Sequence, residues 1–435
     1  MNPNPDCNIF HLGYYFSEWA KLRLLRVWPW VATENDGGGA GMLGRERRVV
    51  KFWALSKRWM FGAAITASIL TAAANFVPAA EKSAAVPQYK VDVSWPKLPL
   101  PDKWALGELG GLFVDSHDNV WIVQRPSTLV AFEKAAALDP PTAECCVPAP
   151  PVIEFDPQGK VVRSWGGPGK GYDWPRTEHG ITVDYKGNVW IGGSATYPGK
   201  NGEPPDGMLL KFSPDGKFLL QIGHAGPSKG SLSQDQLSGV ADVAVDPETN
   251  EVFVADGYGN HRIIVFDADS GAYKRMWGAY GKPPTDQPEG DYDPSAPLAR
   301  QFRNVHCVKL SRDNLVYVCD RDNDRLQVFK RDGTFIAEYP FARDTRPPGT
   351  VGHVAFWPDA TQSILALADL GNFKIRLVRR QDAQVLNTFG HFGNYAGQLN
   401  RMHQVAFDSK GDLFIAEAAG KRVQKWIISN GVRPQ

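Results

Sequence analysis

Residues 242–263 read Asp-Val-Ala-Val-Asp-Pro-Glu-Thr-Asn-Glu-Val-Phe-Val-Ala-Asp-Gly-Tyr-Gly-Asn-His-Arg-Ile, and the fold can be worked out from them. Apolar residues alternate with polar or small ones on both sides of the Pro-Glu-Thr-Asn turn, as they do in a half-buried β-hairpin. A second turn, Gly-Tyr-Gly-Asn, leads into a third apolar run that follows Arg262. The stretch therefore predicts three consecutive antiparallel strands joined by short turns.

The same pattern occurs six times between residues 105 and 427. Each copy continues into a second strand that ends in an acidic or polar residue, then a third strand and, after a glycine-bearing turn, a fourth. Four short strands per repeat predict a β-propeller blade, so the fold class is all-β with six blades. The strand at 89–93 is expected to complete the last blade and close the ring, which removes open strand edges.

The composition agrees with a globular protein whose strands are joined by many turns. Hydrophobic residues make up 43% of the 435 residues and charged residues 22%, which excludes wholesale disorder. The 48 Lys and Arg residues are balanced by 47 Asp and Glu residues, so no positive excess for binding nucleic acid is present. We therefore expect the function to reside in a local site that takes a small molecule or a peptide.

Residues 42–85 carry the features of a secretory signal peptide. Basic residues cluster before residue 59, an uncharged apolar run follows at 59–77, and small residues come next. An uncleaved N-terminal anchor is the alternative, because the run is nearly long enough to span a bilayer. Ala and Thr dominate the run, which favours cleavage and predicts no stable membrane insertion afterwards.

This interpretation divides the chain into three parts. Residues 1–41 resemble no export leader and are interpreted as a possible over-extension of the reading frame. Residues 42–85 are the signal peptide or anchor, and residues 86–435 form the propeller. The protein is accordingly expected to be exported, either to a periplasm or out of the cell.

Four cysteines follow the leader: Cys145, Cys146, Cys307 and Cys319. They allow three pairings, and the sequence leaves the choice open. Cys307 and Cys319 fall on neighbouring strands of one hairpin, although the inferred register does not place them directly opposite each other. The sequence has no Cys-x-x-Cys pair, which argues against a cysteine zinc site or a thioredoxin-like centre.

The first residue of the first strand is histidine in alternate copies of the repeat: His179, His306 and His403. Equivalent positions of the inner strands surround the axis of a propeller, so these three side chains are expected to meet at one point. Three neutral imidazoles with an open fourth position are the ligand set of catalytic zinc. The other three copies have small residues there, which are expected to leave space for a ligand: Gly110, Ala241 and Gly352. The alternation places His353 on the opposite face of its strand.

The blades as a whole, residues 105–427, resemble peptidyl-α-hydroxyglycine α-amidating lyase, a six-bladed propeller. The match at 242–263 is long, and its Asp-Gly-Tyr-Gly-Asn-His-Arg-Ile portion is similar to the NHL repeat. In that family three histidines at this strand start hold zinc, which the resemblance assigns to the three histidines named above. It also assigns the family's catalytic tyrosine to Tyr258 and its catalytic arginine to Arg125.

The chain departs from that family around the third histidine. The lyases have Met-Pro-His-Asp, where this chain has Arg401-Met402-His403-Gln404. The family's active-site methionine therefore aligns with Arg401, and Met402 is displaced by one position. The family's aspartate helps to bind a structural calcium ion, and Gln404 has no charge, which argues against calcium here. Residues 126–150 have no counterpart in the lyases.

The resemblance implies cleavage of the N–C bond of an α-hydroxyglycine-type carbinolamide to an amide and glyoxylate. Zinc would lower the pKa of the substrate hydroxyl, Tyr258 would take its proton, and Arg125 would bind a substrate carboxylate. Two alternatives remain: a zinc-dependent hydrolase of a lactone or ester, and a non-catalytic NHL platform that binds a protein partner. Tyr258 as a packing residue and Arg125 as a surface ion-pair partner are the corresponding structural alternatives.

Overall fold

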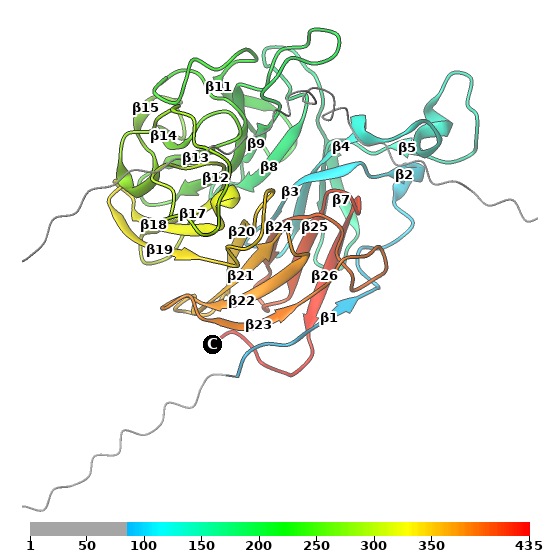
Figure 1. Cartoon of the computed structure of the whole chain (residues 1–435). Coiled ribbons are helices and arrows are strands. Elements are labelled where there is room, and N and C mark those ends of the chain that lie inside the picture. Colours follow the sequence, from blue (N-terminus) through cyan, green and yellow to red (C-terminus); the bar gives the residue numbers. More distant parts are fainter. Residues whose placement is uncertain (1–84) are drawn as a thin grey trace, which may run out of the picture. The chain divides into compact units, whose positions relative to one another are not determined.

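The computed structural model describes residues 85–435, and these contain six four-stranded antiparallel sheets (Figure 1). Blade one contains β3 (Glu108–Val114), β4 (Val120–Arg125), β6 (Val152–Phe155) and β7 (Val161–Trp165). Blade two contains β8 (Glu178–Val183), β9 (Val189–Gly193), β10 (Met208–Phe212) and β11 (Phe218–Gly223). Blade three contains β12 (Val240–Asp246), β13 (Glu251–Asp256), β14 (Arg262–Asp267) and β15 (Tyr273–Trp277).

The second half of the described chain repeats this order. Blade four contains β16 (Val305–Leu310), β17 (Leu315–Asp320), β18 (Arg325–Lys330) and β19 (Phe335–Pro340). Blade five contains β20 (Val351–Phe356), β21 (Ile364–Asp369), β22 (Lys374–Arg379) and β23 (Val385–Phe389). Blade six contains β24 (Met402–Phe407), β25 (Leu413–Glu417), β26 (Arg422–Ile428) and β1 (Tyr89–Asp92).

The remaining elements of the described chain are short. The strands β2 (Trp104–Ala105) and β5 (Val147–Pro148) form a two-stranded parallel sheet. Short 3-10 turns lie at Pro101–Lys103, Pro126–Thr128, Ala131–Ala137, Ala279–Gly281 and Arg321–Asn323. Within residues 85–435, no helix is long and apolar enough to cross a membrane. The predicted segment 1–41 and the predicted leader up to residue 84 lie outside the described residues.

The six blades form a closed ring. The first strands of neighbouring blades contact one another in a complete cycle: β3, β8, β12, β16, β20, β24 and again β3. The predicted all-β propeller with six blades is therefore confirmed. The strand expected at 89–93 is β1, which pairs with β26 as the outer strand of blade six, with Tyr89 opposite Ile428.

The hydrophobic core consists of six separate apolar layers, one between each pair of neighbouring blades. The strand β13 shows how one sequence serves two of these layers. Its Val252 and Val254 pack toward blade two, whereas Phe253 and Ala255 pack toward blade four. Successive side chains of a strand point to opposite faces, so a central strand with two buried faces is apolar throughout.

Buried ion pairs hold the turns that follow the second strands. Arg262 Nε donates to Asp256 Oδ2 at 2.9 Å, and Arg325 Nε donates to Asp320 Oδ2 at 2.8 Å. All four side chains are fully buried. Each aspartate ends a second strand, so each ion pair fixes the turn that comes directly after it.

The strands of each blade are antiparallel, so the loops that precede the first strands and those that follow the second and fourth strands lie on one face of the propeller. Each first strand begins, and each second and fourth strand ends, at the same end of its blade. We call this end the site face. The loop between β4 and β6, residues 126–151, belongs to it and includes β5 (Figure 1). A salt bridge of 2.6 Å joins Glu133 of this loop to Lys421 in the turn after β25.

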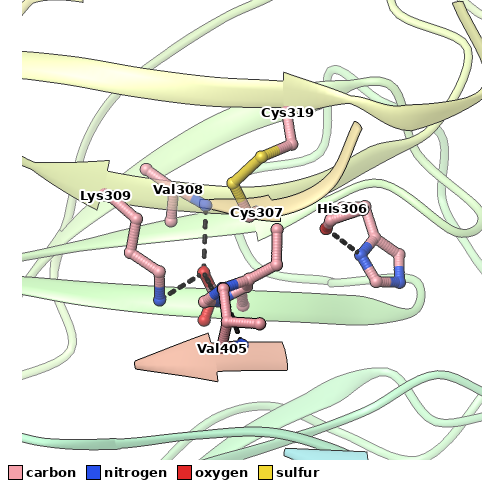
Figure 2. Close-up of a disulfide and its surroundings, with 9 residues drawn as sticks. His306, Cys307, Val308, Lys309, Cys319 and Val405 are labelled. Atoms are coloured by element: carbon pink, nitrogen blue, oxygen red, sulfur yellow. Dashed lines mark hydrogen bonds and ion pairs between the residues drawn. A yellow bond between two sulfur atoms is a disulfide. The ribbon is translucent and has the colours of Figure 1, made fainter. Parts of the chain in front are cut away.

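The cysteines form two disulfides within the described residues, Cys145–Cys146 and Cys307–Cys319. Cys307 and Cys319 stand directly opposite each other on β16 and β17 (Figure 2). The register inferred from the sequence was therefore wrong, because a β-bulge between Val305 and Cys307 shifts the pairing by one residue. Disulfides persist in oxidising compartments, which agrees with a location outside the cytosol.

Candidate metal centre

The three predicted histidines lie together in the central channel. His179, His306 and His403 are each the second residue of a first strand, in blades two, four and six. Their ring centroids are 4.4 to 5.2 Å apart, and one nitrogen from each lies within 4.8 Å of the other two. These blades are not neighbours, so the rings can meet only across the axis. All three side chains are buried, and the group could hold a metal ion.

Every first strand of the described blades has a β-bulge at or next to this position. The shift in pairing falls between the following residues: Leu109 and Gly111, His179 and Ile181, Val240 and Asp242, Val305 and Cys307, Val351 and His353, Met402 and Val405. His306 and His403 therefore lie within bulges, and His179 directly precedes one. Bulges redirect side chains next to functional sites, and here a bulge lies at or directly after each of the three histidines.

Backbone carbonyl groups orient two of the imidazoles. His179 Nδ1 lies 2.8 Å from the carbonyl oxygen of Ala241, and His306 Nδ1 lies 2.6 Å from that of Gly352. A carbonyl accepts a hydrogen bond only from a protonated nitrogen, so each Nε2 keeps its lone pair. Ligand histidines in metal sites are held in this way. His403 Nδ1 has no such partner.

The electrostatic surroundings keep the three imidazoles neutral. Burial lowers the pKa of each well below its usual value of 6.5. The neighbouring imidazoles and the positive charges of Arg125 and Arg321 lower the pKa of His403 further. Neutral imidazole is the form that binds metal ions. The residues present therefore fit a divalent metal ion that prefers nitrogen ligands.

Tyr258 lies directly against this group. It follows β13 by two residues, in the turn where Asn260 Nδ2 donates to Asp256 Oδ2. Its Oη is 2.9 Å from Nε2 of His179 and 2.9 Å from Nε2 of His306. The tyrosine that the resemblance pointed to therefore lies against the histidines, although it comes from a different blade.

Arg125 ends β4 on the same face of the propeller. Its Nε donates to the carbonyl oxygen of Glu178, the residue before His179, at 2.8 Å. Its Nη1 donates to Glu108 Oε2 at 3.3 Å, and 11% of its side chain is exposed. Arg125 is thus mostly buried beside the histidine strand of blade two rather than a free surface residue.

Arg321 is a further residue of the site, which the sequence interpretation missed. Its Nη1 donates to Tyr258 Oη at 3.2 Å, and its guanidinium carbon lies 5.4 Å from the centre of the tyrosine ring. Burial lowers the pKa of Arg321, but Tyr258 and Asp322 raise it above the ordinary value, so the side chain stays charged. A signal was present: Arg321 follows the second strand of blade four, at nearly the place where Arg125 ends that of blade one.

Other expectations around the site are corrected by the structure. A Cβ at Gly110 would lie 2.2 Å from the carbonyl oxygen of Glu178, so this glycine allows two strands to approach and leaves no space for a ligand. Arg401 is exposed, whereas Met402 is buried in the layer between blades five and six. His353 is not a member of the metal group, yet it is buried in the channel, because the bulge shifts the alternation of β20.

Comparisons with known proteins agree with the repeat architecture. A model of the NHL repeat matches residues 237–266. The chain is an NHL-repeat β-propeller that resembles the amidating lyases. This NHL-repeat propeller is 26% identical over 255 residues to the peptidyl-glycine alpha-amidating monooxygenase of Mus musculus, covering 58% of this chain and 23% of that protein.

Two further relatives widen the comparison. The peptidyl-alpha-hydroxyglycine alpha-amidating lyase 1 of Drosophila melanogaster is 27% identical, with 60% of this chain and 47% of that protein covered. The NHL repeat-containing protein 3 of Homo sapiens is 25% identical, with 80% of this chain and 86% of that protein covered. The NHL-repeat propeller thus spans about a quarter of the mouse protein and about half of the fly protein.

Proposed function

We propose that this protein is a zinc-dependent lyase that cleaves the N–C bond of an α-hydroxyglycine-type carbinolamide to an amide and glyoxylate. The position of Tyr258 carries the proposal. Its Oη lies 2.9 Å from two imidazole nitrogens and 3.2 Å from the Arg321 guanidinium. An acid–base group, a metal-ligand set and a cation thus meet at one point. The relatives named for amidation support the reaction type.

The ligand atoms favour zinc over calcium. His179, His306 and His403 offer three neutral nitrogens, which suit zinc, whereas calcium takes six to eight oxygen ligands. A zinc ion held by the three histidines would lower the pKa of a substrate hydroxyl, as it lowers that of water.

The residues of the chain then handle the proton and the charge. Acting as a phenolate, Tyr258 accepts the hydroxyl proton at Oη and becomes a neutral phenol, and the C–O bond becomes the aldehyde carbonyl of glyoxylate. The electron pair of the C–N bond leaves with the amide nitrogen, which takes the proton back from Tyr258. Arg321 stays charged beside the tyrosine oxygen and compensates the negative charge that this oxygen carries before it takes the proton.

Arg125 and Arg321 are the candidates for binding the substrate carboxylate, because a guanidinium matches a carboxylate with two parallel hydrogen bonds. We expect Arg125→Ala to raise KM and also to lower kcat, since the carboxylate is bound in both the ground state and the transition state. Steady-state kinetics with the glyoxylate assay measure this. Arg379→Ala serves as the control, because Arg379 is 42% exposed and pairs with Asp382. An unchanged KM in Arg125→Ala would contradict the assignment.

The proposed reaction is tested by incubating the purified protein with an α-hydroxyhippurate-type substrate. We expect equal amounts of amide and glyoxylate, loss of the activity after chelation, and recovery with zinc. A protein that holds zinc and releases no glyoxylate, but hydrolyses a lactone or ester, would favour the hydrolase alternative. A protein that holds no metal and releases no glyoxylate would favour the NHL binding platform.

We also propose that the protein is exported, to a periplasm or out of the cell. The disulfides of the described residues and the apolar run at 59–77 support this. The mature chain is expected to begin between Ala74 and Val86, because the apolar run and the small residues meet there. N-terminal sequencing of the active protein measures it, and an intact segment 1–58 on that protein would contradict it.

A further inference from the structure

A second group of polar side chains lies in the channel beyond the three histidines. We call it the axial polar layer; its members are Asp242, Lys309, His353 and Gln404. They come from β12, β16, β20 and β24, the first strands of blades three to six. Asp242 and His353 contact each other although blade four lies between their blades, so the layer crosses the axis. Three of its members are buried, and the Lys309 side chain is 18% exposed.

Each acceptor in this layer binds the first strand of the next blade. Asp242 Oδ2 accepts a hydrogen bond from the N–H of Val308 at 3.1 Å, and His353 Nδ1 accepts one from the N–H of Val405 at 3.3 Å. Val308 and Val405 lie two residues beyond His306 and His403. The layer therefore fixes the two strands that carry these metal-ligand histidines.

The Lys309 ammonium balances the charge of the layer. Its Nζ lies 2.8 Å from Asp242 Oδ2, and Figure 2 shows Lys309 and the nitrogen of Val308 directed at the same carboxylate oxygen. Burial alone would raise the pKa of Asp242, but Lys309 and His353 bring it down to about 2, so the carboxylate is ionised. Burial and Lys309 lower the pKa of His353 to about 4, so that ring is neutral at pH 7.

A calcium ion does not fit this layer. His353 Nδ1 accepts a hydrogen bond, so its Nε2 carries the proton, and this donor lies 3.6 Å from Asp242 Oδ2, beyond hydrogen-bond distance. Gln404 Oε1 accepts from the N–H of Leu112 at 2.8 Å, which leaves the amide NH₂ as its free group. Of the buried atoms in the layer without a partner, Asp242 Oδ1 is an acceptor, whereas His353 Nε2 and Gln404 Nε2 are donors. Calcium needs several oxygen ligands, and here donors surround a single carboxylate.

We propose that Lys309 is an internal cation that takes the place of a structural metal ion. Through Asp242 it positions the strand of His306, and through Asp242 and His353 it positions the strand of His403. Lys309 and Asp242 are positioning residues, because they act on the metal centre only through the backbone of β16 and, by way of His353, through that of β24. The inference rests on the metal site of the proposed function and is independent of the reaction catalysed there.

The first test uses the unaltered protein and needs no variant. Elemental analysis of the purified protein should find no stoichiometric calcium, and added Ca²⁺ should leave Tm unchanged, since only a ligand that binds the native state raises it. A calcium-dependent rise in Tm would overturn the proposal. This result would say nothing against the lyase activity, which the glyoxylate assay measures separately.

The second test is a double-mutant cycle on Lys309 and Asp242, in which Tm, Co²⁺ binding and the cobalt absorption spectrum are measured for each variant. The variants Lys309→Met and Asp242→Asn should each lower Tm, because each leaves a buried charge without its partner. Each should weaken Co²⁺ binding to the histidines by roughly ten- to hundredfold and alter the cobalt absorption spectrum. The double variant should recover most of both losses, and Lys309→Arg should keep the cobalt spectrum.

Lys211→Met is the matched control for this cycle. Lys211 is a buried lysine that is bound to the carbonyl oxygen of Ala268 at 2.7 Å and to Asp269 at 3.3 Å, and it lies on β10 outside the channel. It should lower Tm and leave Co²⁺ binding unchanged. Additive losses in the double variant of Lys309 and Asp242, or single variants that change Tm alone, would overturn the positioning role.

Discussion

Tyr258→Phe is expected to lower the turnover of α-hydroxyglycine amides by about 10²-fold or more, the usual loss when a positioned acid or base is removed. The loss should appear in kcat more than in KM, because the proton is transferred in the transition state. The variant should keep its zinc, since the residues that could hold the ion are the three histidines and Tyr258 is not one of them. The ring should still pack against Arg321, whose guanidinium carbon lies 5.4 Å from its centre. Steady-state kinetics and elemental analysis of the same preparation measure these outcomes.

Tyr185→Phe is the control for this experiment. Tyr185 lies in the turn between β8 and β9, at the end of the blade away from the site face, and its Oη donates to Asn250 Oδ1 at 2.9 Å. The loss of this hydroxyl should leave kcat unchanged. A Tyr258→Phe variant that works at the parent rate would show that Tyr258 only packs against the histidines, and the acid–base role would have to be given up.

His306→Ala is expected to abolish metal binding while the propeller stays folded. Two imidazoles remain, and a zinc site of this type needs three protein ligands. The blades are held by the apolar layers between them, to which the His306 side chain does not belong. We therefore expect a zinc content near zero, no glyoxylate release, and cooperative thermal unfolding that resembles that of the metal-free parent. Elemental analysis and circular dichroism measure both parts.

His117→Ala provides the comparison, because the side chain of His117 is 82% exposed and lies in the turn between β3 and β4. It should keep one zinc ion per chain. Full metal occupancy in His306→Ala would mean that the ligand set is wrong. Loss of zinc in both variants would point to a general loss of structure, which the unfolding curve would show independently.

The sequence by itself determined the fold and picked out the three histidines that could hold a metal ion. The repeated alternation first seen in 242–263 was sufficient for six blades, because a propeller blade is built from local hairpins whose pattern is written in consecutive residues. His179, His306 and His403 were found for the same reason. Equivalent positions in the repeats lie at equivalent places around the propeller axis, so histidines that recur at one position of the repeat are expected to surround that axis.

Only the tertiary structure decided the contacts between blades, because these contacts join residues far apart in the sequence, whose proximity no local sequence pattern predicts. The approach of Arg321 to Tyr258 spans 63 residues, and the pairing of Asp242 with Lys309 joins two different blades. The bulge in each first strand also escaped the sequence, since it adds one residue to the pairing without breaking the apolar alternation. That extra residue placed Cys307 opposite Cys319 and turned His353 into the channel. The three histidines follow from the repeat, whereas the groups that orient and balance them depend on how neighbouring blades pack.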